Sequence, residues 1–301
     1  MAPLRHYAAY LRPRMFPATF IMALTGWAAS PTRPRQLAVC ARQLALLFVV
    51  HSVLLWGGTN AYNSSQDRDA GPVNLLPNPP PLPPRLDVFG VACMALAVAV
   101  ATLAGARAAL LTACAIPLSI YYSIKSGKPS GKPPARAPRV RRGKDIGGVD
   151  NAIYAVGGAG SILLGWCITG APLDARAVSI AFGFALAIFG GCPTTQIFQL
   201  GPRDDYATSP SWTTLLGARR TLIAGAAFFA AHVAWLARAW PSSRSPSWWL
   251  TLGWASLVAL GAAHSVWWSR APFVAPYRRM VRQMSLMLAS QLCWTGAALT
   301  V

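Results

Sequence analysis

The stretch that decides the fold begins as the apolar run LALLFVVHSVLLW (Leu44–Trp56) and continues, after three small residues, as NAYNSSQDRDAGP (Asn60–Pro72). A run of this kind predicts a membrane-spanning helix, which needs about 20 predominantly apolar residues. If the helix continues for one or two more turns, polar residues three, four and seven positions apart share one of its faces. These residues are Asn60, Asn63, Ser64 and Asp67.

The shared face carries side-chain oxygens, which are the ligands of a hard divalent cation. Mg²⁺ in particular takes one or two carboxylates and leaves the rest of its shell to water and phosphate. We therefore interpret the stripe as a candidate Mg²⁺ site. Asp69 points away from it in a regular helix, but Gly71-Pro72 ends the helix close by, so Asp69 stays a candidate ligand. The alternative is a helix end capped by polar residues, with no metal.

The composition indicates that lipid is the main solvent of this chain. Of its 301 residues, 54% are hydrophobic and 12% are charged, whereas soluble proteins carry about 25% charged residues. The net charge is +19, but the basic residues flank apolar runs and follow no nucleic-acid-binding pattern, so we expect no nucleic-acid partner. The six Cys form no C-x-x-C pair, which argues against a zinc site or a disulfide framework.

The apolar segments predict an all-α integral membrane protein, a single polytopic domain over residues 1–301 with nine transmembrane helices. The segments lie near 15–31, 38–61, 87–106, 107–124, 150–170, 175–198, 215–237, 248–268 and 281–300. Three longer polar loops follow the second, fourth and sixth segments, at about 62–86, 125–149 and 199–214. Lys and Arg are concentrated on the side of these loops and of the N-terminus. The positive-inside rule places that side in the cytoplasm, at the plasma membrane if the protein is bacterial.

Two of the polar loops carry further signals. The middle loop contains KSGKPSGKPPARAPRVRRGK (Lys125–Lys144), whose cations suit either anionic lipid headgroups or a phosphate held by Arg. The third polar stretch begins with GCPTTQIFQ (Gly191–Gln199) inside an apolar segment. Pro193 frees a backbone carbonyl there, and the following hydroxyls and amides can rejoin the hydrogen-bond network. Polar and acidic residues that enter a membrane segment often mark a site.

This arrangement of acid-containing loops after the second and sixth helices resembles the UbiA superfamily of intramembrane prenyltransferases. The first motif is similar over Asn63-Ser64-x-x-Asp67-Arg68-Asp69-x-Gly71-Pro72-Val73, followed by Asn78-Pro79-Pro80. The second is similar over Pro193-x-Thr195-Gln196-Ile197-Phe198-Gln199, followed by Asp204 and Leu216-Gly217. The basic loop between them is similar over Pro138-x-Val140-Arg141 with Lys144, and Asp150 lies beyond it.

The resemblance implies a helical bundle around a central cavity that opens sideways to lipid. It also implies transfer of an isoprenyl group from a diphosphate to an unidentified acceptor, with Mg²⁺ as cofactor. The residues it assigns to the first metal are Asn60, Asn63, Ser64, Asp67 and Asp69. Those assigned to the second metal are Asp204 and Asp205, with Gln196 and Gln199 holding or orienting it. The cations assigned to the diphosphate are Arg141, Lys144 and Lys125. Asp67 and Asp204 would be the central catalytic acids.

The sequence departs from the family pattern Asn-Asp-x-x-Asp-x-x-x-Asp. Counted from Asn60, the acidic positions hold Ala61, Ser64 and Arg68, and Asp67 and Asp69 straddle the last of them. Two alternatives therefore stay open beside the transferase. One is a terpene cyclase that folds the prenyl chain onto itself, and the other is a non-catalytic membrane protein or transporter. Transporters often pair two broken helices, and the second segment has no break that matches Pro193.

Overall fold

The computed structural model describes residues 3–68, 76, 78–124, 143, 146–199, 211–239 and 247–301, without the side chains of 198, 199 and 239. Six predicted site residues lie outside this description: Asp69, Lys125, Arg141, Lys144, Asp204 and Asp205. The side chain of Gln199 also lies outside it.

The described residues fold into helices joined by short turns. In chain order they are α1 (Leu4–Tyr10), η1 (Pro13–Met15), α2 (Phe16–Ala29), α3 (Leu37–Leu47), η2 (Phe48–Trp56), α4 (Gly57–Asp67), α5 (Leu86–Ala101), η3 (Thr102–Ala104), α6 (Ala106–Ser123), α7 (Val149–Ile168), α8 (Ala175–Gly191), η5 (Cys192–Gln199), α9 (Trp212–Leu216), α10 (Ala218–Ala239), α11 (Trp248–Trp268) and α12 (Pro276–Leu299).

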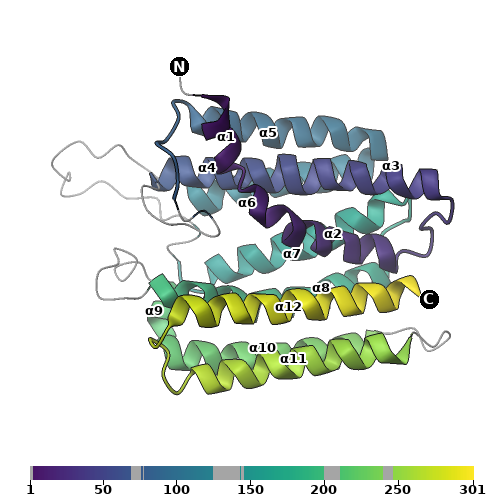
Figure 1. Cartoon of the computed structure of the whole chain (residues 1–301). Helices are drawn as coiled ribbons and strands as arrows, with labels where there is room; N and C mark the ends of the chain where they lie inside the picture. Colours follow the sequence, from purple (N-terminus) through teal and green to yellow (C-terminus); the bar gives the residue numbers. More distant parts are fainter. Residues whose placement is uncertain are drawn as a thin grey trace.

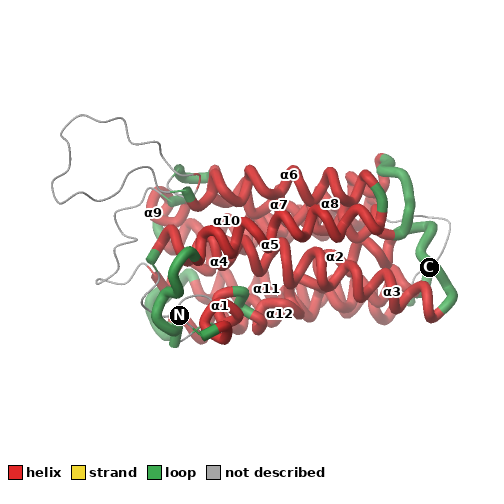
Figure 2. The backbone as a smooth tube through the Cα atoms, turned by 90° about the horizontal axis from the view of Figure 1, so that it is seen from above, coloured by secondary structure: helices red, strands yellow, loops and turns green. Residues whose placement is uncertain are grey.

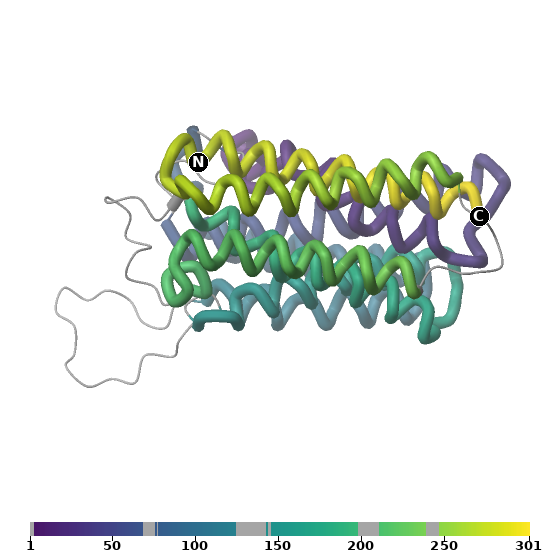
Figure 3. Tube along the Cα trace, turned by 90° about the horizontal axis from the view of Figure 1, so that it is seen from below, coloured from purple at the N-terminus to yellow at the C-terminus, as the bar shows by residue number. Residues whose placement is uncertain are grey.

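The long helices form two rings that share α2 and α7 as a common wall. The first ring runs through α2, the continuous helix α3–η2–α4, α5, α6 and α7. The second runs through α7, α8, α10, α11, α12 and back to α2. Figure 1 shows the helices of both rings aligned along one axis, with the two chain termini at opposite ends of the bundle. The same alignment is seen from above and from below (Figures 2 and 3).

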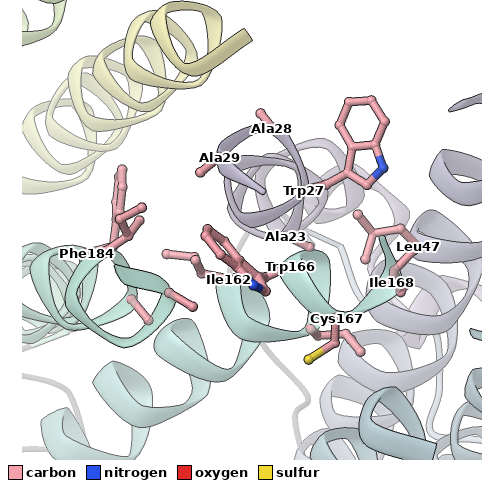
Figure 4. Packing of buried hydrophobic residues seen from close by; sticks show 14 of the residues in the cluster. Ala23, Trp27, Ala28, Ala29, Leu47, Ile162, Trp166, Cys167, Ile168 and Phe184 are labelled. Carbon is pink, nitrogen blue, oxygen red and sulfur yellow. The ribbon is translucent and has the colours of Figure 1, made fainter. Parts of the chain in front are cut away.

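The wall between α2 and α7 depends on glycine at two positions. A Cβ atom at Gly26 would lie 1.8 Å from the carbonyl oxygen of Ile162, and one at Gly165 would lie 1.8 Å from that of Ala23. The two backbones therefore touch directly, which is the packing that small residues allow between membrane helices. Trp166 is fully buried beside this contact, and Figure 4 shows it among the apolar side chains of both helices.

Six helices of the described part are long and apolar enough to cross a membrane, in agreement with the prediction of an integral membrane protein. They are Leu37–Asp67, Leu86–Ala104, Val149–Ile168, Ala175–Ile197, Ala218–Arg238 and Trp248–Trp268. The predicted segments at 15–31, 107–124 and 281–300 coincide with α2, α6 and α12, which are not among the six. The count of nine membrane spans and the orientation of the termini therefore stay predictions.

The second predicted segment differs from expectation in two respects. The helix continues to Asp67 instead of ending near residue 61, so the first polar loop begins later than predicted. Its centre, Phe48–Trp56, is a π-helix, in which His51 and Ser52 are fully buried. Such stretches often occur at functional sites. The helix stays continuous, so it has no break that matches the one at Pro193. It is not, however, the regular α-helix that we expected.

Candidate functional site

The candidate site lies at the end of the bundle where α4 and α6 end and α7 begins, the end marked by α9 in Figure 1. A hydrogen bond ties the first two of these helix ends together, since the Ser123 hydroxyl donates to Oδ1 of Asn63 over 2.9 Å. A second bond crosses from α7 to η5, between Asp150 and Gln196. The described residues that flank the three polar loops thus lie at one end of the bundle.

The polar stripe on α4 forms as the spacing predicted. Because α4 is a regular helix through Asp67, the residues at 60, 63, 64 and 67 share one face. Asn60, Asn63 and Asp67 are partly exposed. The helix stops at Arg68, which adopts the left-handed conformation with φ of 56°. The last residue of the stripe is therefore a carboxylate, Asp67, at this end of the bundle.

Ser64 differs from the other stripe residues because its side chain is fully buried. Its Oγ accepts a hydrogen bond of 2.9 Å from Nη2 of Arg12. Arg12 is only 4% exposed and sits in a left-handed turn between α1 and η1, with φ of 55°. From the sequence, we used the basic residues near the N-terminus only to assign topology. The structure instead places a buried guanidinium against the first motif.

The second motif is held by a chain of hydrogen bonds that starts at Asp150. This carboxylate is fully buried in the first turn of α7 and accepts a bond of 3.1 Å from the backbone N–H of Gly148. Its other oxygen accepts from Nε2 of Gln196, also over 3.1 Å. Oε1 of Gln196 accepts from the Thr213 hydroxyl over 3.1 Å. Gln196 is therefore fixed at both ends of its amide, between α7 and α9.

Pro193 has the local effect that the sequence predicted. The helix changes from α8 to the 3₁₀ helix η5 at this point. The Thr194 hydroxyl donates to the carbonyl of Gly191, and the Thr195 hydroxyl donates to that of Cys192. The Thr213 hydroxyl also lies 3.1 Å from the carbonyl oxygen of Pro193, so it shares its single proton between this oxygen and Oε1 of Gln196. These bonds pair carbonyls at the break with hydroxyls, which lets an irregular backbone lie at membrane depth.

Two tyrosines lie between the two motifs. The hydroxyl groups of Tyr122 on α6 and Tyr154 on α7 are 3.2 Å apart. This contact joins α6, which Ser123 ties to α4, to the start of α7.

The chemistry of the donors fits Mg²⁺. Asn60, Asn63 and Asp67 offer amide and carboxylate oxygens, and Mg²⁺ commonly binds through one or two carboxylates while keeping several waters. Within the part of the chain that the structure describes, no three His, Cys, Asp or Glu residues come close enough to hold a metal ion. A metal at this end would therefore rely on amide oxygens beside Asp67, or on carboxylates outside the described residues.

Comparisons with known proteins agree on one family. The model of the UbiA prenyltransferase family matches residues 15–286. A UbiA homologue from Archaeoglobus fulgidus bound to Cd²⁺ has a similar fold, with a TM-score of 0.64 and 15% identity over 98% of this chain and 100% of that one.

Two further solved structures share the fold. A digeranylgeranylglyceryl phosphate synthase has a TM-score of 0.64 and 13% identity over 100% of both chains. A UbiA homologue from Aeropyrum pernix K1 has a TM-score of 0.59 and 17% identity over 94% of this chain and 96% of that one. No curated protein sequence matches the chain.

Proposed function

Because the chain belongs to the UbiA prenyltransferase family, we propose that it transfers an isoprenyl group from a prenyl diphosphate to an acceptor in the membrane, with Mg²⁺ as cofactor. Solved structures of the Archaeoglobus fulgidus homologue, which has the same fold, hold GPP with Mg²⁺ or DMAPP with Mg²⁺. The observation that carries the proposal is the set of hydrogen bonds that links the α4 stripe to buried Arg12 and to α6, α6 to α7, and α7 to η5 through Asp150 and Gln196, at one end of the bundle.

The metal would be held by Asn60, Asn63 and Asp67. We leave Ser64 out of this set because its hydroxyl is fully buried against Arg12. Asn63 also accepts a hydrogen bond, from Ser123, but it stays in the set because its side chain is partly exposed. Asp69, Asp204 and Asp205 stay candidate ligands, since they lie outside the described residues. Gln196 would orient the second metal site and would not bind the metal itself, because both the nitrogen and the oxygen of its amide are engaged in the link between α7 and α9. The same role is proposed for Gln199.

The substrate diphosphate needs positive charge, which several groups at this end would supply. Bound Mg²⁺ would neutralise the negative charge that develops on the leaving diphosphate. Arg12 adds a guanidinium that the fold has already desolvated and oriented, so it would act at low reorganisation cost. Arg141 and Lys144, with Lys125, are the further cations proposed from the motif resemblance. The apolar bundle would exclude water from the allylic cation.

The test is release of diphosphate from a panel of prenyl diphosphates, with and without Mg²⁺, followed by analysis of the lipid products. Metal-dependent release with a prenylated product supports the transferase. A cyclic product formed without any acceptor would instead identify a terpene cyclase, and Asp67 would keep its role in ionisation. If no donor is turned over under any metal condition, the protein is a non-catalytic member of the family.

A further inference from the structure

The short helix α1 is held in place by the chain that follows the first motif. A helix of seven residues is not stable alone in water, so contacts with the rest of the chain must hold it. The hydroxyl group of Tyr10 donates to the carbonyl of Pro80, which lies 70 residues further along the chain. Tyr10 is fully buried, in one apolar cluster with Ala61 of α4 and Leu86 of α5. The last residue of α1 is therefore tied to both sides of the first polar loop.

The end of α1 and the two residues after it follow one face of α4. A Cβ atom at Gly57 would lie 3.2 Å from Cδ2 of Leu11, so the Leu11 side chain packs directly against the start of α4. Arg12 is bonded to Ser64, which lies three residues beyond Ala61. Positions 57, 61 and 64 share a helical face, because they are four and three residues apart. This face adjoins the polar stripe and meets it at Ser64.

Arg12 needs this support because its conformation is costly. Its backbone is left-handed, with φ of 55° and ψ of 62°, directly before Pro13. Residues other than glycine keep such a conformation only where the surrounding structure fixes it. The long side chain also loses conformational entropy when it is buried, and Arg12 is only 4% exposed. The place of the guanidinium therefore depends on how firmly the end of α1 is anchored.

We propose that Tyr10 is a positioning residue, whose bond to Pro80 holds the guanidinium of Arg12 at the first motif, where it would meet the substrate diphosphate. This inference rests on the proposed transferase function. Because its side chain is fully buried, Tyr10 acts through Arg12 and not on the substrate itself. Tyr7, one turn earlier, makes the same kind of bond to the carbonyl of Pro84 over 2.8 Å, but at an exposed position. Water can replace an exposed partner, so the hydroxyl of Tyr7 contributes little.

The first arm of the test measures the position of Arg12 without any substrate. Phenylglyoxal modifies accessible guanidinium groups, and mass spectrometry gives the rate of modification at Arg12, with exposed Arg14 as internal reference. Tyr10→Phe removes only the hydroxyl group, and Tyr7→Phe is the matched control. We expect the rate at Arg12 to rise about threefold to tenfold in Tyr10→Phe, the range for one buried hydrogen bond between neutral groups. It should stay at the wild-type value in Tyr7→Phe. Equal rates at Arg12 in the wild type and Tyr10→Phe, or an equal rise in both variants, would overturn the proposal.

The second arm measures diphosphate release from geranyl diphosphate at saturating Mg²⁺. We expect Tyr10→Phe to lower kcat/KM by about threefold or more, the effect of displacing a group that must be placed accurately. The loss should not exceed that of Arg12→Gln, because Tyr10 acts only through Arg12. In the Arg12→Gln background, Tyr10→Phe should therefore cause no further loss. Losses that multiply in the double variant would show that Tyr10 acts independently of Arg12, which overturns the proposal.

The two arms separate failure of this inference from failure of the proposed function. If the wild-type protein releases no diphosphate from any prenyl donor, the proposed function fails, and the modification arm still decides whether Tyr10 holds Arg12 in place. If the wild type is active and Tyr10→Phe loses activity while Arg12 keeps its protection from phenylglyoxal, the loss has another origin. The proposed function then stands, and the positioning role of Tyr10 is overturned.

Discussion

Asp67 is the residue on which the first motif depends most. It is the only carboxylate on the α4 stripe, and it lies at the partly exposed end of the helix. Removing its charge should leave the fold intact, because Asn has nearly the same shape as Asp and the position is a partly exposed helix end. It should abolish most of the metal-dependent turnover, because Mg²⁺ would lose its only carboxylate among the described stripe residues.

We predict that Asp67→Asn keeps the wild-type Tm and loses metal-dependent diphosphate release by about tenfold or more, which corresponds to at least ~1.4 kcal/mol. Asp87→Asn, an exposed acid in the first turn of α5, is the matched control and should keep full activity. Wild-type turnover in Asp67→Asn together with an inactive Asp69→Asn would show that the helical placement of the metal ligands is wrong.

Asp150 and Gln196 lie 46 residues apart in the chain and act as one unit. Changing Asp150 to Ala would leave the partly buried N–H groups of Gly148 and Gln196 without their acceptor, at a cost of up to about 1–3 kcal/mol for each unsatisfied group. We predict that Asp150→Ala and Gln196→Leu each lower the free energy of unfolding. The double variant should lose less than the two single losses added together, because both remove the same bond. Strict additivity in chemical denaturation would contradict the link.

Some residues of the site could be predicted from neighbouring positions in the sequence, and others depend on contacts between distant segments. The shared face of Asn63 and Asp67 could be predicted because helical spacing is a property of neighbouring residues. The contact of Arg12 with Ser64 spans 52 positions, and no pattern within the sequence pairs them. Asp150 was noted only as part of the motif resemblance. Its burial and its bond to Gln196 depend on how α7 meets η5, which periodicity does not encode.

At the scale of elements, the contact between α2 and α7 holds the two rings together. A Cβ at Gly165 would lie 1.8 Å from a backbone oxygen of Ala23, which cannot move without shifting α2. At Gly160, on the same helix, a Cβ would meet nothing within 4 Å. The two glycines therefore form a matched pair in which only one site is crowded.

We predict that Gly165→Ala lowers the free energy of unfolding by about 1–3 kcal/mol or more, the usual cost of overpacking. Gly160→Ala should be neutral or stabilising by about 0.5–1 kcal/mol, since alanine favours the helix. Thermal unfolding of the two variants in the same detergent gives the comparison. If both variants unfold at the same temperature, the direct backbone contact between α2 and α7 does not exist.

The elements themselves were largely predictable, because a membrane span is a long apolar run. The nine predicted segments each coincide with a helix of the structure. The π-helical stretch in the second segment was not predictable, since its residues are as apolar as those of a regular span. The short helix α9 was also missed, because five residues at the end of a polar loop are too few to give a periodic signal.

At the scale of the whole molecule, the site is proposed to combine groups from both rings with the basic loop. If the cations of that loop serve only lipid attraction, they are interchangeable. If Arg141 and Lys144 bind the diphosphate, their loss is specific. We predict that Arg141→Gln with Lys144→Gln raises the KM for the prenyl diphosphate about a hundredfold or abolishes turnover, because each provides a charge-assisted bond of about 1.5–3 kcal/mol.

The matched control is Lys128→Gln with Lys132→Gln, which removes the same charge from the first half of the same loop. This pair should leave the KM unchanged. Equal losses in the two double variants would leave only the general attraction to anionic lipid.

The most direct measurement of the central claim is diphosphate release by the full chain in lipid vesicles supplied with geranyl diphosphate. The account predicts release that depends on Mg²⁺, stops when the metal is removed with EDTA, and returns when Mg²⁺ is added back. It also predicts that the same vesicles with Asp67→Asn show almost none. Release that is independent of the metal, or that is equal in wild type and Asp67→Asn, would contradict the account.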